Sequence, residues 1–262
     1  MSFFDAIILG LVEGITEFLP ISSTAHLMMT SKVLELNQSE FLKSFEVVIQ
    51  LGAIVAVVFL FGSRLIKNAW LWKKVLIAFI PTAVIGFLLY KLIKTHLIGN
   101  ISVAVWALVI GGVALIAVEH LLSKKSNVQG ESSSEVKDIT NKQAFFIGLT
   151  QSLAIIPGVS RAAATIVPAL FFGASRKAAA EFSFLLAIPT VAAAAGYDLL
   201  KNFDTIALND NIIILMTGFI VSMVAAVFSI KFMLSYISKH SFRGFGIYRI
   251  IVAGLFFLLF LG

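Results

Sequence analysis

Two glutamates near the start of the chain, Glu13 and Glu17, lie four residues apart in an apolar segment. Residues at this spacing share one face of an α-helix. Two carboxylates in a site of low dielectric repel each other unless a metal ion, a shared proton or a cationic side chain compensates their charge. The pair is therefore a candidate ligand set for a divalent cation, and two solvated glutamates at a helix end are the simpler alternative.

Hydroxyl side chains follow the glutamates at Ser22, Ser23 and Thr24, just before a second helical pattern. One of the serines is a natural N-cap, which would leave free backbone N–H groups directed into the chain break before it. Ser160 stands in the same relation to a helix predicted over 161–172. Each hydroxyl alone is explained by ordinary capping, but two helix N-termini that converge on one cavity would form an anion site.

A guanidinium and an imidazole accompany these caps. Arg161 would bind two phosphate oxygens at once and stay charged, so the predicted anion site suits phosphate. Thr165, one turn further on, would add a hydroxyl on the same face. His26 could hydrogen-bond back to Ser23 or to a ligand, and could act as general base, general acid or nucleophile toward phosphorus.

Other polar side chains within apolar segments are second-rank candidates. Glu46, Gln50 and Gln151 are predicted to support the cavity as neighbours of the site residues. Arg249, in the last apolar run, is predicted to reach the membrane interface or to neutralise a carboxylate, and Glu181 is expected at the interface.

The elements that position these residues are predicted to be membrane helices. Of the 262 residues, 59% are hydrophobic and only 13% are charged, whereas a soluble domain carries about 25% charged residues. Runs long enough to cross a bilayer core, about 20 residues each, occur six times, and no extended alternating pattern suggests a β-barrel. These runs are about 45–62, 75–91, 101–120, 178–198, 211–231 and 244–261. The absence of cysteine excludes thiolate metal sites and a cysteine nucleophile.

Two further apolar segments, 2–36 and 143–172, are broken midway, and their pieces are too short to span. The breaks are Pro20-Ile21-Ser22-Ser23 and Pro157-Gly158-Val159-Ser160-Arg161. Non-helical backbone at membrane depth must be enclosed by protein or water. Both segments are therefore predicted to be re-entrant helix–loop–helix hairpins whose tips meet inside a single membrane domain, 1–262.

A polar linker, 123–142, divides the chain into two related halves, 1–122 and 143–262. The matched pairs are Gly10 with Gly148, Pro20 with Pro157, Ser23 with Ser160 and Phe45 with Phe182. Each half holds one hairpin and three crossings, which is an odd number. The halves should therefore form an inverted-topology repeat, as in many transporters.

Basic residues predict the orientation of the chain. By the positive-inside rule, the segments expected in the cytoplasm are 62–74, 176–177 and 237–243. Counting crossings then places the linker inside, both termini outside and 91–100 outside, despite Lys91 and Lys94. The net charge of +6 fits loops beside anionic lipid, so no nucleic-acid partner is expected.

The segment Leu9–His26 closely resembles the first signature of the BacA-type undecaprenyl-diphosphate phosphatases, and 157–161 with Thr165 resembles the second. The stretches 45–52 and 181–189 also resemble family segments, so the likeness covers essentially the whole chain.

The resemblance implies an integral phosphatase of the bacterial plasma membrane that removes the terminal phosphate of undecaprenyl diphosphate. Such an enzyme recycles the lipid carrier for peptidoglycan, confers bacitracin resistance and depends on a divalent cation, usually Mg²⁺ or Ca²⁺. The positions that match the family motifs are Glu13, Glu17, Ser22, Ser23, His26, Ser160, Arg161 and Thr165. Three positions depart from the family pattern: Ala162 and Ala163 stand where serine and glycine are common, and Ala25 stands where glycine is usual.

Three routes to the nucleophile stay open at this stage. They are Ser23 activated by His26 and the glutamate pair, His26 itself, and a metal-activated water with Glu17 as base. The cavity is expected to open outward onto a polyprenyl diphosphate lipid, and a homodimer is one expected arrangement. An alternative function is a transporter or flippase for a phosphorylated lipid, since inverted repeats with broken helices are typical of carriers.

Overall fold

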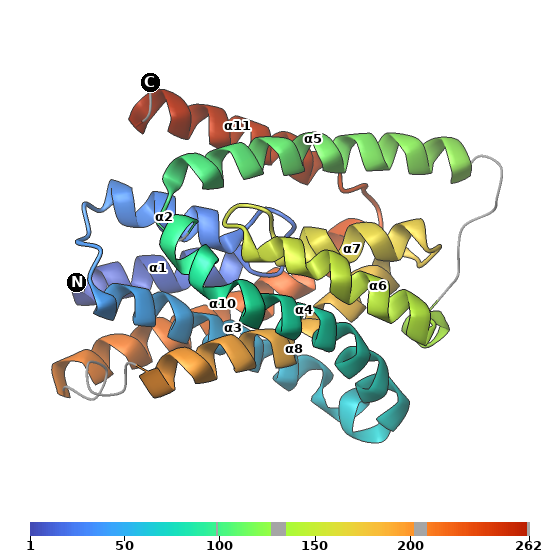
Figure 1. Ribbon diagram of the computed structural model, residues 1–262, viewed down its shortest axis with the longest axis horizontal. Coiled ribbons are helices and arrows are strands. Elements are labelled where there is room, and N and C mark those ends of the chain that lie inside the picture. Colours follow the sequence, from blue (N-terminus) through green and yellow to red (C-terminus); the bar gives the residue numbers. More distant parts are fainter. Residues whose placement is uncertain (98, 127–134, 202–208, 261–262) are drawn as a thin grey trace.

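The computed structural model describes residues 1–97, 99–126, 135–201 and 209–260, and all regular structure within these ranges is helical (Figure 1). Six helices are long. They are α3 (Glu40–Lys67), α4 (Ala69–His96), α5 (Ile101–Ser126), α8 (Arg176–Lys201), α10 (Asn209–Ile237) and α11 (Arg243–Phe260). Each contains a stretch long and apolar enough to cross a membrane. The chain therefore has the helices of a multi-pass membrane protein.

The predicted crossings, as far as they are described, fall one within each long helix. The prediction of six crossings is thus confirmed as six candidate spans. Most of the helices extend beyond the apolar runs at their ends, because hydropathy marks only the part suited to hydrocarbon, whereas backbone hydrogen bonding continues into polar residues.

The two broken segments form short helices on either side of an irregular break. The first pair is α1 (Phe3–Thr16) and α2 (Ser23–Val33). The second is α6 (Asn141–Gln151), followed by the 3₁₀ helix η2 (Ser152–Ile155), and α7 (Arg161–Phe171). Helix interruption at both predicted places is confirmed.

Both pairs begin with the same capping device. Ser2 accepts from the backbone N–H of Asp5 at 3.2 Å, and the Asp5 carboxylate accepts from the Ser2 N–H at 2.6 Å. Thr140 and Gln143 repeat this arrangement at the start of α6. A reciprocal cap satisfies two of the backbone donors that a helix start leaves free, so the sequence fixes where each pair begins.

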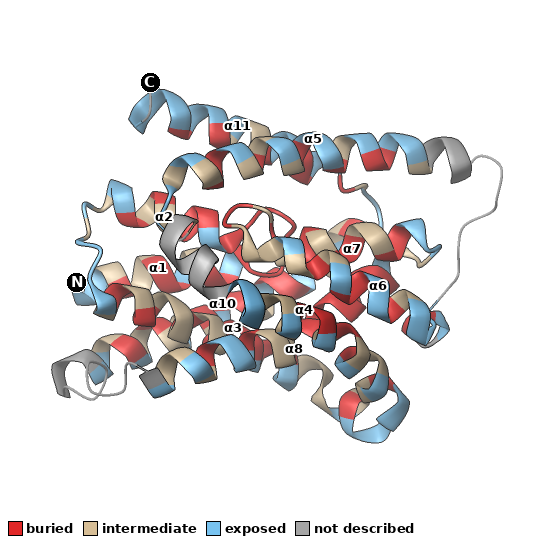
Figure 2. Ribbon diagram, in the orientation of Figure 1, coloured by how far each residue is buried: buried red, intermediate tan, exposed pale blue. Residues whose placement is uncertain are grey.

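The breaks lie midway along the bundle and are enclosed by the long helices (Figure 1). Helix α1 packs against α10, α6 against α4, α5 against α11, and α3 against α8. In α8, 67% of the apolar stretch is buried, against 28% to 39% in the other five, so α8 is the central helix. Figure 2 shows buried residues around the breaks and exposed residues on the outer helix faces.

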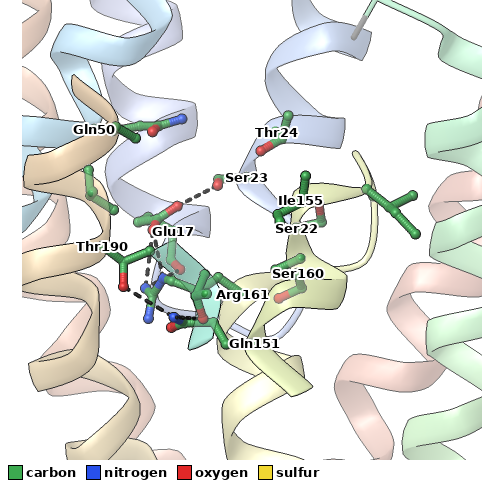
Figure 3. Close-up of a pocket in the computed structure, with 16 residues that line it drawn as sticks. Glu17, Ser22, Ser23, Thr24, Gln50, Gln151, Ile155, Ser160, Arg161 and Thr190 are labelled. Atoms are coloured by element: carbon green, nitrogen blue, oxygen red, sulfur yellow. Dashed lines mark hydrogen bonds and ion pairs between the residues drawn. The ribbon is translucent and has the colours of Figure 1, made fainter. Parts of the chain in front are cut away.

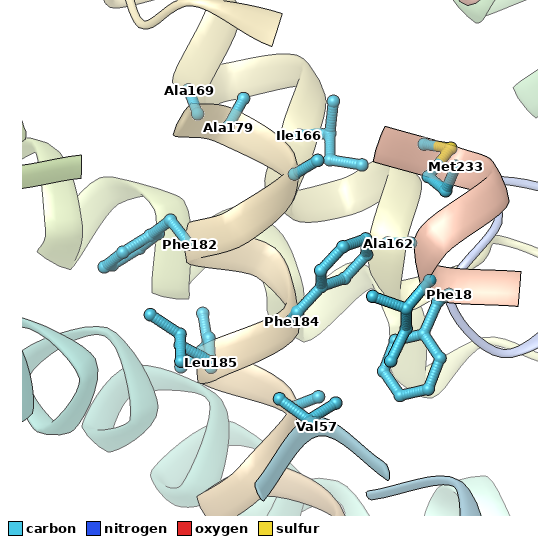
Figure 4. Packing of buried hydrophobic residues seen from close by; sticks show 14 of the residues in the cluster. Phe18, Val57, Ala162, Ile166, Ala169, Ala179, Phe182, Phe184, Leu185 and Met233 are labelled. Atoms are coloured by element: carbon cyan, nitrogen blue, oxygen red, sulfur yellow. The ribbon is translucent and has the colours of Figure 1, made fainter. Parts of the chain in front are cut away.

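Aromatic packing anchors the first break to the central helix. Phe18, directly after Glu17, is fully buried and meets Phe184 of α8 edge to face, with ring centroids 5.3 Å apart (Figure 4). Ala162 of α7 is also fully buried in this cluster. Where the resemblance leads one to expect serine, the chain therefore has a methyl group that packs in the core.

Two ion pairs and a hydrogen bond tie the three basic segments to neighbouring helices at one end of the bundle. Arg64 pairs with Glu181 at 2.6 Å, and Arg176 pairs with Glu119 at 3.0 Å. Glu119 also accepts from the backbone N–H of Phe242 at 2.8 Å. Both described chain ends lie at the opposite end of the bundle, although apart from each other (Figure 1), so the structure agrees with the predicted grouping of loops.

The predicted linker 123–142 lies partly outside the described residues, as do the side chains of Lys91 and Lys94. Within the linker, α5 continues to Ser126, and the 3₁₀ helix η1 (Val136–Asp138) precedes α6.

Candidate active site

A cavity of about 170 Å³ lies between the two breaks and is lined from both of them and from the neighbouring helices (Figure 3). Its polar lining residues are Glu17, Ser22, Ser23, Thr24, Gln50, Thr82, Gln151, Ser160, Arg161 and Thr190. The structure thus brings together eight of the site residues that the sequence indicated, which lie far apart along the chain.

Glu17 is the centre of the site. Its Oε1 atom accepts from Nη2 and Nε of Arg161 at 3.1 and 3.3 Å, and its Oε2 atom accepts from the hydroxyl of Ser23 at 2.5 Å. The two charged side chains are only 7% and 10% exposed. Arg161 therefore supplies cationic compensation for Glu17, one of the two glutamates predicted to need it, and this ion pair connects the two breaks.

The two capping serines adopt the same unusual backbone conformation. Ser22 has a φ of 70° and Ser160 a φ of 75°, in a region of backbone conformation that residues other than glycine rarely adopt. The Ser22 hydroxyl accepts a hydrogen bond from the backbone N–H of Ala25, and the Ser160 hydroxyl accepts one from the backbone N–H of Ala163. Both predicted caps are confirmed. The local strain, which typically costs about 1–3 kcal/mol, places each hydroxyl and its helix N-terminus at the cavity.

An amide and two threonine hydroxyls form the wall opposite these caps. Gln151 donates from Nε2 to Thr82 at 2.9 Å and to Thr190 at 3.2 Å. Thr82 in turn donates to the carbonyl of Gly148 at 2.7 Å. Neither threonine was among the predicted site residues. Each follows a proline within a predicted crossing, which was the available signal.

Two of the predicted acidic residues lie behind the cavity wall rather than on it. Glu13 is fully buried, and neither of its carboxylate oxygens has a hydrogen-bond partner within the described residues. Glu46 accepts from the hydroxyl of Ser31 at 3.0 Å. Glu13 is therefore a buried carboxylate whose oxygens are available for another ligand.

The donor set suits a hard cation only in part. No group of three or more His, Asp or Glu side chains gathers in metal-binding geometry in the described ranges. Mg²⁺, however, commonly takes one or two protein carboxylates and completes its shell with water and substrate phosphate oxygens. The orphaned oxygens of Glu13, one helix turn before Glu17, fit such a partial site.

His26 is directed away from the cavity. Its Nδ1 atom lies 2.8 Å from the carbonyl of Ser22, and its Nε2 atom lies 3.0 Å from the hydroxyl of Tyr248 on α11. The two rings are also stacked, with centroids 5.6 Å apart. The predicted contact between His26 and Ser23 is wrong for this structure, because the serine hydroxyl turns to Glu17 instead.

Thr165 also faces away from the cavity. Its hydroxyl lies 3.0 Å from the carbonyl of Arg161 in its own helix and 2.7 Å from the hydroxyl of Ser183. Threonine within a helix commonly bonds the preceding turn in this way. Ser183 also accepts from Arg161 through its carbonyl at 2.8 Å, so Thr165 supports the guanidinium from behind.

Comparison with known proteins gives the family. A family model described as "Bacitracin resistance protein BacA" matches residues 6–255. The chain belongs to the BacA family. An undecaprenyl-diphosphatase of Aquifex aeolicus (strain VF5) is 47% identical over 262 residues, covering 100% of both chains. Another, of Campylobacter hominis (strain ATCC BAA-381 / DSM 21671 / CCUG 45161 / LMG 19568 / NCTC 13146 / CH001A), is 51% identical over 257 residues, covering 98% of both chains.

The names of these BacA relatives agree with the phosphatase that the sequence resemblance implies, and they lend no support to the transporter alternative. The family signatures that were recognised in the sequence are also the segments that meet at the cavity.

Proposed function

We propose that this chain is an undecaprenyl-diphosphate phosphatase. It hydrolyses the lipid diphosphate to undecaprenyl phosphate and inorganic phosphate, which recycles the carrier for peptidoglycan synthesis and confers bacitracin resistance. Family membership over residues 6–255 supports this activity. The observation that carries it is the contact of Ser23, Glu17 and Arg161 at one cavity, because these groups supply a hydroxyl, a base and a phosphate ligand.

The diphosphate binds between the two capped helix N-termini. Backbone N–H groups at the starts of α2 and α7, the hydroxyls of Ser22, Thr24 and Ser160, and the Arg161 guanidinium face this region. Arg161 exchanges part of its contact with Glu17 for phosphate oxygens and stabilises the charge that develops on the transferred phosphoryl group.

Glu17 is the general base. Its hydrogen bond from Ser23 is geometrically ready for proton transfer. The carboxylate takes the proton from Ser23, or from a water at the same place, as the oxygen attacks the terminal phosphorus. The bond between this phosphorus and the bridging oxygen then breaks, and undecaprenyl phosphate leaves with the bonding electrons. In the serine route, water then hydrolyses the phosphoserine and releases inorganic phosphate. His26 is not the nucleophile; it binds the carbonyl of Ser22 and so helps to hold the first break in place.

Glu13 and Glu17 would hold a divalent cation, Mg²⁺ or Ca²⁺, together with the substrate. Bound there, the cation would neutralise charge on the diphosphate. The unpartnered oxygens of Glu13 support this assignment.

The two short-helix pairs are re-entrant hairpins of an inverted repeat in the bacterial plasma membrane. Support comes from pairs of contacts in which the first and second halves of the chain exchange roles. A side chain at Gly112 would meet the carbonyl of Gly246, and one at Gly246 would meet the carbonyl of Gly112, each at 2.7 Å. Likewise, α1 packs on α10 as α6 packs on α4. The basic end is cytoplasmic, and the cavity and both termini face outward.

The direct test is phosphate release from undecaprenyl diphosphate by the purified protein in detergent. Glu17→Gln and Arg161→Ala are each expected to lower kcat by at least about 100-fold. Glu35→Gln and Arg243→Ala make the same changes at exposed positions and should retain wild-type rates. Absence of release from folded wild type that still binds the lipid would refute the proposal.

The route is tested separately by rapid quenching with substrate labelled in the terminal phosphate. Label trapped on wild type but absent from Ser23→Ala identifies the serine as nucleophile. A burst-free time course without trapped label identifies direct attack by water.

A further inference from the structure

Arg249 of α11 is fully buried, yet it neither reaches an interface nor pairs with a carboxylate within the described residues. Both predictions for this residue are therefore wrong. A guanidinium has five N–H donors, and all of the contacts found here are to backbone carbonyls. The acceptors are Leu108 (3.2 Å from Nε), Pro20 and Val159 (3.2 and 3.1 Å from Nη1), and Ala107 and Gly158 (2.9 and 2.7 Å from Nη2).

These five carbonyls come from three different parts of the chain. One belongs to the first break, two belong to the second break, and two belong to α5. Carbonyls in a break have no partner in a helix, and a buried polar group without a partner is costly. A single side chain therefore satisfies both breaks at once and joins them to α5.

The carbonyls that Arg249 holds lie next to the phosphate-binding caps. Pro20 precedes Ser22 by two residues, and Val159 directly precedes Ser160. The strained φ values of both serines require surroundings that hold the backbone in place. The Arg249 contacts are suited to this task, because they fix the residues just before each cap.

We propose that Arg249 is a positioning residue, which sets the distance and angle between the two helix N-termini that bind the diphosphate. The inference rests on the proposed phosphatase function. Arg249 does not line the cavity, so it acts through Ser22 and Ser160. Its fixed positive charge behind both breaks also favours the anionic substrate.

Gly111 of α5 offers a way to displace the guanidinium without removing it. A Cβ atom at this position would collide with Nη2 and Cζ of Arg249. Gly111→Ala should leave α5 well formed, since alanine favours a helix by about 1 kcal/mol over glycine. Gly254→Ala is the matched control on α11, because nothing lies within 4 Å of its added Cβ.

The experiment compares wild type, Gly111→Ala, Gly254→Ala and Arg249→Lys, with kcat normalised to folded protein. Lysine keeps the charge but cannot hold five carbonyls. We expect kcat to fall about 100-fold in Arg249→Lys and at least about tenfold in Gly111→Ala, since small misplacements of positioned groups have effects of this size. Gly254→Ala should match wild type.

The double variant Gly111→Ala/Arg249→Lys separates positioning from general damage. Without the guanidinium, the added methyl group has nothing to displace. The double variant should therefore be as active as Arg249→Lys alone, whereas independent structural damage would multiply the two losses.

A spectroscopic readout does not depend on activity. Val33 on α2 and Phe171 on α7 are 59% and 50% exposed, and the chain has no native cysteine. Nitroxides on cysteines at these two positions should give a broader distance distribution in Gly111→Ala and Arg249→Lys than in wild type or Gly254→Ala.

A folded Gly111→Ala protein with wild-type kcat and an unchanged distance distribution would overturn the proposal. Wild-type kcat and an unchanged distance distribution in folded Arg249→Lys would also overturn it. If Arg249→Lys does not fold, the result for Gly111→Ala alone decides between the proposal and its rejection. If wild type releases no phosphate, the proposed function fails, while the nitroxide distances still test whether Arg249 positions the two breaks.

Discussion

Glu17 combines an ion pair and a hydrogen bond in a largely buried position. It is nearly buried, paired with Arg161 and hydrogen-bonded by Ser23. A buried ion pair contributes modestly when intact, but loss of one partner leaves the charge of the other uncompensated in a largely buried position. We therefore expect this pair to affect both the stability of the junction between the breaks and the proposed chemistry at the cavity.

We predict that Arg161→Met lowers the free energy of unfolding by about 3–5 kcal/mol, because Glu17 then stays buried without its cation. Adding Glu17→Gln should recover much of this loss by removing the charge, but should restore no activity. Thermal unfolding in detergent, followed beside phosphate release, measures both effects. A double variant that is no more stable than Arg161→Met would contradict this interpretation.

Glu13 differs from Glu17 in having no hydrogen-bond partner among the residues that the structure describes. If it is a cation ligand, Glu13→Gln should raise the Mg²⁺ concentration that gives half-maximal activity by at least about tenfold. The protein should stay folded, because the change removes an unpaired buried charge. Phosphate release titrated with Mg²⁺ after chelation measures the shift. Glu46→Gln, which changes a carboxylate that binds Ser31, is the control; an equal shift there would exclude a specific role for Glu13.

At the scale of elements, the two breaks are the features that make a site out of membrane helices. Each begins after a short helix, ends at a serine with positive φ, and leaves a helix N-terminus directed at the cavity. A continuous helix would satisfy these N–H groups internally and could not offer them to an anion.

Glycine and alanine at Ser160 should separate backbone strain from the hydroxyl contact. Ser160→Gly relieves the positive φ, whereas Ser160→Ala keeps the strain and loses the cap. We expect Ser160→Ala to have a lower Tm than Ser160→Gly, while both lose activity because neither presents the hydroxyl to phosphate. Equal activity of Ser160→Gly and wild type would show that only the backbone conformation matters there.

At the scale of the whole molecule, the distribution of charge predicts the orientation in the membrane. The ion pairs of Arg64 and Arg176 mark one end, and the described termini mark the other (Figure 1). The positive-inside rule assigns the basic end to the cytoplasm.

Single cysteines in this cysteine-free chain test the orientation. Lys177 and Gln38 are both exposed, the first at the basic end and the second just before α3. A membrane-impermeant thiol reagent applied to intact cells should label Gln38→Cys directly, and Lys177→Cys only after permeabilisation. Labelling of both from the same side would overturn the proposed topology.

The sequence by itself determined the local features of this protein. Hydropathy over about 20 residues depends only on neighbouring residues, and so it predicted the six spans. Proline and serine act on their own backbone, so the two breaks, a serine cap after the first and the cap at Ser160 could also be predicted; that the first cap is Ser22 rather than Ser23 came from the structure. The residue types at the breaks, with their resemblance to BacA motifs, indicated a phosphate site before any contact was known.

Only the tertiary structure decided which side chains meet. Ser23 could turn to His26 or to Glu17, and the choice depends on where α7 and α11 place Arg161 and Tyr248. Arg249 binds carbonyls because the two breaks happen to face it from distant parts of the chain. Such contacts depend on helix packing between segments more than 100 residues apart, and local sequence carries no information about that distance.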